Sequence, residues 1–325
     1  MKILGIGNAL VDTMVKLEND SVLKDFNFPK GSMQLVEKEV VVKLNDVTSR
    51  LKKSLSSGGS VANAIHGLAK LGIHAGYIGK IGEDDTGRAF QNDMNSVDVN
   101  TKMLKSSSLS GQAMVLVSPD SERTFAVYLG AAIELSADDL KSYLFDGFDL
   151  LMIEGYLVQN HNLILQAAKM AKSKNMKIAI DLASYNVVQD NLDFIKNLVK
   201  EFADIVFANE EEAKAFTGKE PEEALNDIAS VCDIAVVKIG KNGSMIKAGN
   251  NTYNVGVISV ESNDTTGAGD LYASGFLYGL AKGLGLEKCG KIGAICSGNV
   301  IEVVGSKMDE ARWSKIRNMI REIEK

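Results

Sequence analysis

The chain has 325 residues, 45% of them hydrophobic, which is enough to bury a large core without disulfides or a structural metal. Its formal net charge is −6 and its charges are mixed along the chain, which argues against the basic surface that nucleic-acid binding requires. No apolar run approaches the roughly 20 residues of a membrane span, and the N-terminus shows no export signal, so we expect a soluble cytoplasmic protein.

Short apolar segments alternate with longer segments of helical periodicity along most of the chain. The pattern predicts strands at residues 2–6, 76–80, 150–153, 177–180, 205–208 and 234–239. It predicts helices at residues 60–71, 86–94, 161–174, 192–201, 211–216, 221–231, 268–281, 288–304 and 310–323. This alternation indicates the α/β class, with a doubly wound, mainly parallel central sheet flanked by helices and ligands bound at one rim.

Two segments interrupt the alternation and predict a small β-sheet. Residues 13–38 contain strand-like pieces, and residues 111–129 contain two apolar runs, 112–117 and 124–129, that flank Pro119-Asp120-Ser121-Glu122 and predict a hairpin. We interpret residues 1–325 as one α/β domain in which these insertions form a lid over the ligand site.

The most informative motif opens the helix predicted at 268–281 and reads Asp264-Thr265-Thr266-Gly267-Ala268-Gly269-Asp270. Its glycines allow a tight turn, and the backbone amides of Gly267, Ala268 and Gly269 would face an anion at the helix N-terminus. Asp270 lies in the same turn, where a carboxylate can accept the proton of an attacking hydroxyl, as phosphoryl transfer requires. The alternative is an ordinary helix start that Asp264 caps and in which the glycines only pack.

This segment resembles the second signature of the ribokinase-like (PfkB) carbohydrate kinase family at every fixed position. The run Gly58-Gly59-Ser60-Val61-Ala62-Asn63-Ala64 is similar to the first signature, and Asn209-Glu210-Glu211-Glu212 resembles the N-x-x-E motif of the family. The motifs follow the family's order over essentially the whole chain. The resemblance therefore implies a kinase that transfers the γ-phosphate of ATP, with Mg²⁺, to a sugar or nucleoside hydroxyl, and Asp270 as general base.

The resemblance assigns substrate binding to Asp12, which follows the first predicted strand, and extends it to Asn8. Gly58 and Gly59 would let the backbone approach the substrate, while Asn63 would direct its amide at substrate hydroxyls. Without the resemblance, Asp12 would be a solvated loop acid and Asn63 an exposed residue in the first turn of a helix.

Arg123 lies in the predicted lid and is a further candidate for substrate binding. It could contact the substrate or the transferred phosphoryl group when the lid closes, because a guanidinium suits phosphate. An equally open alternative is a surface arginine paired with Glu122 or Asp120.

Two segments are expected on the nucleotide side. Asn209 and Glu212 lie one helical turn apart, and the resemblance implies that they organise Mg²⁺ largely through water. From sequence alone the pair indicates a capping box. Lys238, Gly240 and Gly243 resemble the segment beside the ATP phosphates, although the same residues also predict a plain hairpin turn.

Further nucleotide contacts come from the resemblance alone. Thr266, with Gly267 and Gly269, would lie against the phosphates, and Asn299 belongs to the segment that borders adenine. Activation by a monovalent cation is common in the family, so a K⁺ requirement stays open. The choice between monomer and homodimer also stays open.

The acceptor is the least determined part of the prediction. Residues 5–12 and 30–37 resemble the adenosine kinase branch, whereas 111–113 and 122–125 also occur in fructokinase-like members. We favour an adenosine-like nucleoside, with a fructokinase- or ribokinase-type sugar kinase as the alternative. A stacking aromatic from the lid would favour the nucleoside. Distant alternatives are a nicotinamide-dependent oxidoreductase, suggested by Gly5-Ile6-Gly7, and a non-catalytic binding protein.

Overall fold

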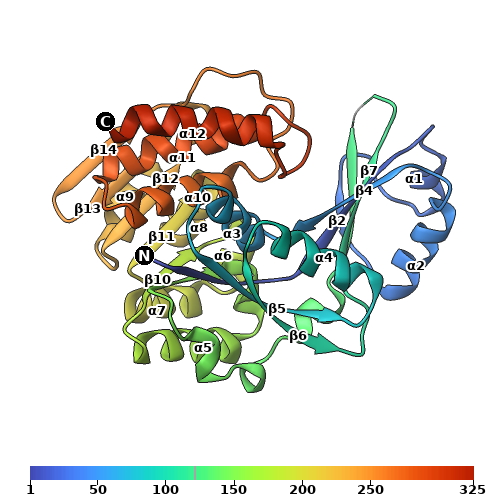
Figure 1. The fold of residues 1–325 in the computed structure, drawn as a ribbon, viewed down its shortest axis with the longest axis horizontal. Helices are drawn as coiled ribbons and strands as arrows, with labels where there is room; N and C mark the ends of the chain where they lie inside the picture. The colour runs from blue at the N-terminus through green and yellow to red at the C-terminus, as the bar shows by residue number, and fades with distance from the viewer. Residues whose placement is uncertain (121) are drawn as a thin grey trace.

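The computed structural model describes residues 1–120 and 122–325, so Ser121 of the predicted turn lies outside the described residues. Its larger sheet has nine strands in the order β14-β13-β12-β11-β10-β9-β1-β5-β6 (Figure 1). These strands are β1 (Ile3–Ile6), β5 (Ala75–Gly82), β6 (Asn100–Ser106), β9 (Leu150–Glu154), β10 (Lys177–Asp181), β11 (Ile205–Asn209), β12 (Ile234–Lys238), β13 (Ser244–Ala248) and β14 (Asn251–Val255). Among the described strands of this sheet, only the pairs β12–β13 and β13–β14 are antiparallel, which confirms the predicted mainly parallel sheet.

Helices cover both faces of this sheet because alternate strand residues point to opposite sides. In β10, Ala179 belongs to one apolar cluster, whereas Ile178 and Ile180 belong to the other. The first cluster packs under α3 (Ser60–Lys70), α4 (Asp85–Ser96), α10 (Ala268–Ala281), α11 (Leu286–Val300) and α12 (Glu310–Glu324). The second packs under α5 (His161–Ser173), α6 (Tyr185–Asp190), α7 (Leu192–Phe202), α8 (Glu210–Thr217) and α9 (Pro221–Ala229). The doubly wound arrangement is confirmed.

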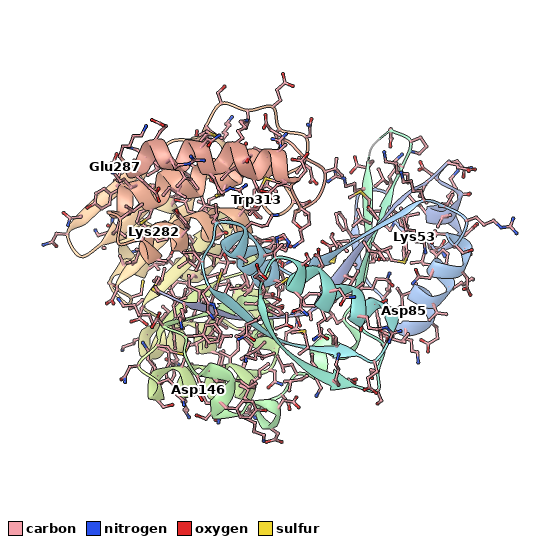
Figure 2. All side chains as sticks on the ribbon, viewed as in Figure 1. Lys53, Asp85, Asp146, Lys282, Glu287 and Trp313 are labelled. Atoms are coloured by element: carbon pink, nitrogen blue, oxygen red, sulfur yellow. The ribbon has the colours of Figure 1, made fainter. Side chains whose placement is uncertain are left out.

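The interior between these layers is filled by side chains, as Figure 2 shows. Trp313 of α12, labelled there, is 1% exposed and belongs to the first cluster. Within the described residues, no helix combines the length and apolar character needed to cross a membrane.

A second sheet has five strands in the order β3-β8-β7-β2-β4 and lies to one side of the larger sheet (Figure 1). Its strands are β2 (Leu10–Lys16), β3 (Met33–Leu35), β4 (Lys53–Gly58), β7 (Gly111–Val117) and β8 (Arg123–Tyr128). Helices α1 (Ser21–Asp25) and α2 (Lys38–Val47) cover one face through a third apolar cluster. The predicted hairpin is confirmed as the antiparallel pair β7–β8. That this sheet moves as a lid stays a prediction.

The order of the strands determines where a ligand can bind. From β1 the chain proceeds to β5 and β6 on one side and later returns to β9 on the other side. Parallel sheets of this kind bind ligands at the carboxyl ends of the strands, where the strand order reverses. Glu154, Asp181 and Asn209 end β9, β10 and β11, so this topology places them on one rim.

Candidate active site

A cavity of about 890 Å³ lies at this rim and extends over the start of α10 to the second sheet. The cavity is near the upper end of the range for one ligand, so it has room for two small substrates. Many of the predicted site residues line it: Asp12, Gly59, Asn63, Asn209, Glu212, Lys238, Gly240, Gly243, Thr266, Ala268, Gly269 and Asp270. These residues come from segments far apart in the sequence, and the fold brings them together.

Asp270 lies in the first turn of α10 and is held by two side chains of α3. The Ser60 hydroxyl donates to Asp270 Oδ1 at 2.9 Å, and Asn63 Nδ2 donates to Asp270 Oδ2 at 3.0 Å. Burial raises the pKa of Asp270 to about 6, although the bond from Asn63 acts in the opposite direction. An ionised Asp270 is therefore available above that pH, with a lone pair of each oxygen still free to accept a proton.

Asn63 is a positioning group in this structure. Its amide donates to Asp270, while its Oδ1 accepts a hydrogen bond from the Ser306 hydroxyl at 3.0 Å. The side chain is 6% exposed, yet it borders the cavity. Contact with substrate hydroxyls, as predicted for Asn63, stays a prediction.

Three glycines beside the cavity lie so close to neighbouring atoms that a larger side chain would not fit. Gly59 has φ +98°, and a Cβ there would lie 2.3 Å from the carbonyl oxygen of Asn8. A Cβ on Gly58 would lie 2.3 Å from Asp12 Oδ1, so the missing side chain leaves room for that carboxylate. Gly267 is the N-cap of α10 with φ +77°, and a Cβ there would lie 2.8 Å from Ser306 Cβ.

The sequence predicted that the amides of Gly267, Ala268 and Gly269 would all face an anion, but one of the three is engaged within the protein. The Ala268 amide donates to the Thr265 carbonyl at 3.1 Å, which closes a turn before the helix. Among the described residues, the Gly267 and Gly269 amides have no backbone acceptor. These two amides, rather than that of Ala268, are the open donors for an anion in this conformation.

A second group of charges lies at the ends of β10, β11 and β12. Lys238 Nζ lies 3.3 Å from Asp181 Oδ2. A Cβ on Gly269 would lie 3.0 Å from the same Nζ, so the ammonium faces the start of α10. Burial works to lower the pKa of Lys238, but Asp181, Glu212 and Asp270 together raise it, so the side chain stays cationic.

Asn209 and Glu212 form the capping box that the sequence indicated. Asn209 Oδ1 accepts from the Glu212 amide at 2.8 Å, and Glu212 Oε2 accepts from the Asn209 amide at 2.8 Å. Both residues also line the cavity. Burial, followed by the nearby Asp181, raises the pKa of Glu212 to about 7. Within the part of the chain that the structure describes, no three His, Cys, Asp or Glu side chains are arranged to hold a metal ion.

Three predicted residues lie beside the cavity rather than on its wall. Asn8 is 8% exposed, and its side chain donates to Glu154 Oε1 at 2.8 Å. Gly58 and Gly267 contribute space through their missing side chains, as described above.

Asn299 is placed differently from the prediction. Its side chain is fully buried, and Nδ2 donates to the Ile295 carbonyl at 2.9 Å, so it faces the core instead of the cavity. The face of α11 on the cavity carries Ala294, Ser297 and Gly298, followed by Ile301. Helical geometry explains the difference, because these residues recur at intervals of three and four whereas residue 299 points elsewhere.

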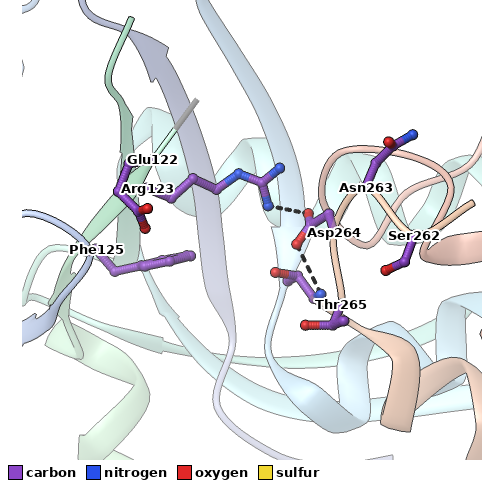
Figure 3. A pocket seen from close by; sticks show the side chains of 9 residues that line it. Glu122, Arg123, Phe125, Ser262, Asn263, Asp264 and Thr265 are labelled. Atoms are coloured by element: carbon purple, nitrogen blue, oxygen red, sulfur yellow. Dashed lines mark hydrogen bonds and ion pairs between the residues drawn. The ribbon is translucent and has the colours of Figure 1, made fainter. Parts of the chain in front are cut away.

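Arg123 is not the surface arginine paired with Glu122 or Asp120 that was considered from sequence, and its contact with a substrate stays a prediction. It forms an ion pair with Asp264, across the gap between β8 and the loop before α10 (Figure 3). Asp264 also accepts from the Thr266 amide at 3.0 Å and from the Gly305 amide at 2.6 Å. The pair borders a second cavity of about 410 Å³, which Phe125 also lines. Arg123 therefore connects the second sheet to the loop before α10.

Other residues at the site were missed from sequence. Glu154 and Asp181 end buried strands, and the rule that ligands bind at strand ends could have identified them. Part of the apolar lining of the cavity comes from Val257, Ile258 and Val260, which lie in a segment without regular structure. No periodic signal marks such a segment.

Comparisons with known proteins agree with this geometry. A model of the pfkB family of carbohydrate kinases matches residues 33–311. A 5-dehydro-2-deoxygluconokinase of Halalkalibacterium halodurans is 30% identical over 264 residues, covering 75% of this chain and 79% of that protein. An uncharacterised sugar kinase of Archaeoglobus fulgidus is 28% identical over 243 residues, covering 74% and 96% respectively.

Solved structures of sugar and nucleoside kinases also resemble this chain. The adenosine kinase of Sinorhizobium meliloti superposes with a TM-score of 0.85 at 33% identity, covering 98% of this chain and 99% of that one. A probable sugar kinase of Rhizobium etli has the same TM-score and identity, with 98% of both chains covered. These similarities exclude the two distant alternatives, an oxidoreductase and a non-catalytic binding protein. The chain belongs to the pfkB family of carbohydrate kinases and is a phosphotransferase that acts on an alcohol group of a sugar or nucleoside.

Proposed function

We propose that the protein is an ATP-dependent kinase of a nucleoside such as adenosine, with Asp270 as the general base. The observation that carries the proposal is the position of Asp270. It lies on the cavity wall in the first turn of α10, and two side chains of α3 orient its carboxylate.

Each group at the site has a distinct task in this mechanism. The acceptor hydroxyl lies beside Asp270, which takes its proton as the oxygen attacks the γ-phosphorus in line. The Gly267 and Gly269 amides donate to the oxygens on which charge develops. Lys238, facing Gly269, adds a positive charge on the phosphate side. Asn209 and Glu212 would hold Mg²⁺ through water, and that ion would neutralise phosphate charge when bound.

The lid supports a nucleoside acceptor. Phe125 of β8 lines the smaller cavity together with Arg123 and residues 262–266, next to the start of α10 (Figure 3). An aromatic ring there can stack on a base, which a sugar acceptor lacks. Asp12, at the end of this sheet nearest the larger cavity, would accept hydrogen bonds from ribose hydroxyls.

A sugar remains the second candidate. It is favoured by the polar character of the acceptor end, where Asp12 and Asn63 line the cavity, and by the 30% identity to a 5-dehydro-2-deoxygluconokinase. In that case Phe125 would cover a sugar ring without a base to stack on.

The test is a kinase assay with Mg²⁺ and ATP, in K⁺ and in Na⁺, over adenosine, other nucleosides, fructose, ribose and sugar acids. The proposal predicts the highest kcat/KM for a purine nucleoside. A sugar or sugar acid that exceeds adenosine by tenfold or more would replace the nucleoside, and the absence of transfer to any acceptor would contradict the kinase mechanism.

A further inference from the structure

A buried carboxylate, Glu154, joins three elements beneath the cavity. It ends β9 and is 1% exposed. Its Oε1 accepts from the Asn8 side chain at 2.8 Å and from the Asn8 backbone amide at 3.2 Å. Its Oε2 accepts from the Val61 amide at 3.2 Å. All three partners donate to the carboxylate, an arrangement that favours its ionised form.

The bond to Val61 reaches the catalytic carboxylate through the start of α3. Val61 lies in the first turn of that helix, between Ser60 and Asn63. Those two neighbours are the residues whose side chains donate to Asp270. Because Ser60, Val61 and Asn63 share one helical turn, a shift of the Val61 amide would move both donors, and with them the orientation of Asp270.

The space around Glu154 allows little adjustment. A Cβ on Gly7 would lie 2.4 Å from Glu154 Oε2, so the carboxylate packs directly against that backbone. Burial raises the pKa of Glu154 to about 7, although the three hydrogen bonds act to lower it.

We propose that Glu154 is a positioning residue whose ionised carboxylate fixes the start of α3 and Asn8, and thereby the geometry of the phosphoryl-transfer base. It touches neither substrate nor nucleotide in this role. The proposal rests on the function proposed above for Asp270. Protonation of Glu154 would weaken its acceptance from Val61 and loosen the turn that carries Ser60 and Asn63.

The test compares E154Q with wild type, with Y77F as the matched control. Glutamine keeps the size of the side chain, but its amide group cannot accept both from Asn8 and from Val61. Tyr77 lies against the same Gly7 backbone, and among the described residues its buried hydroxyl has no hydrogen-bond partner, so its removal perturbs the same region without breaking the network.

For E154Q we expect kcat/KM for the acceptor to fall about tenfold or more at pH 8, as for a buried donor left unpaired. The KM for ATP should stay within about twofold, because the nucleotide groups lie on other elements. On its acid side, the pH profile of kcat/KM for the acceptor should lose one protonation step. E154D should restore that step, and Y77F should behave as wild type.

An exchange measurement keeps the two proposals separable. Amide hydrogen exchange over residues 60–64 should be faster in E154Q than in wild type and Y77F, whether or not any acceptor is phosphorylated. If wild-type protein showed no kinase activity, that result would contradict the proposed function but not the positioning role of Glu154. An E154Q variant with the wild-type acceptor kcat/KM, pH profile and amide exchange would overturn the positioning role. If E154Q does not fold, the E154D variant provides the test. Equal rises in its KM for ATP and its KM for the acceptor would overturn the positioning role.

Discussion

At the scale of single residues, the site depends on carboxylates that are difficult to ionise. Burial raises the pKa of Asp270 to about 6, and the bonds from Asn63 and Ser60 and the charge of Lys238 limit the rise. A general base must be unprotonated, so kcat/KM for the acceptor should fall as the pH drops from 7 toward 5. Lys238→Met removes a nearby cation, so the same fall should occur at higher pH than in wild type. An unchanged pH profile of kcat/KM in the Lys238→Met variant would show that the charge of Lys238 does not influence the pKa of Asp270.

Gly59 provides a second prediction at this scale. Its φ of +98° and the 2.3 Å approach to the Asn8 carbonyl should make Gly59→Ala lose about 3 kcal/mol or more of unfolding free energy. Gly72→Ala is the control, since Gly72 has φ +86° but nothing within 4 Å of a Cβ. That variant should lose about 1 kcal/mol, from backbone strain alone. Urea unfolding measures both, and equal losses would contradict the steric argument.

The residues that sequence could identify are those that lie close together in the chain. The motif at 264–270 brings the proposed base and the open amides together by covalent adjacency, so its chemistry could be predicted before the fold was known. Glu154 and Asp181 become neighbours of that motif only through the strand register, and neither carries a local signature. Asn299 illustrates the opposite problem. Its helix borders the cavity, but the sequence did not determine the helical phase that turns Ser297 and Gly298, rather than Asn299, toward it.

At the scale of elements, an ion pair between Arg123 and Asp264 joins the second sheet to the loop before α10. Arg123 is 16% exposed and Asp264 is 5% exposed, so loss of one partner leaves a poorly solvated charge. We expect Arg123→Gln to cost about 2 kcal/mol of unfolding free energy and to raise the acceptor KM, with a smaller effect for Arg123→Lys. Chemical denaturation and steady-state kinetics check this. Wild-type kinetics in the Arg123→Gln variant would show that the ion pair with Asp264 has no part in turnover.

The central sheet was predictable because its strands are buried on both faces and form continuous apolar runs. Strands at the sheet edges and in the inserted segments were harder to predict. β4 reads Lys-Ser-Leu-Ser-Ser-Gly and β6 is largely polar, so neither shows the apolar run or alternation that marks a strand. Their strand character comes from pairing with β2 and β5, which is a property of the assembled fold.

At the scale of the whole molecule, the acids at the site oppose its stability above neutral pH. The pKa values of Asp12 and Asp270 are raised to about 6, and those of Glu154 and Glu212 to about 7, in each case first by burial. The folded state thus holds these protons more tightly than the unfolded chain. Their contribution to stability is complete below the unfolded pKa values and is lost as the pH rises through 6 to 7.

Asp270→Asn should therefore become more stable relative to wild type between pH 5 and pH 8, because the amide cannot ionise. The Tm difference between the two proteins, measured by calorimetry at both pH values, tests this. A difference that does not change with pH would show that burial of the carboxylate has no energetic consequence. Such a gain in stability with a loss of turnover is common at active sites.

The most direct test of the account is a single-turnover experiment with the Asp270→Asn variant, Mg²⁺, ATP and the best acceptor from the kinase assay. We predict that ATP binds with a Kd within about threefold of wild type while the rate of phosphoryl transfer falls by a factor on the order of 100 or more. Transfer at the wild-type rate would contradict the assignment of Asp270 as the base.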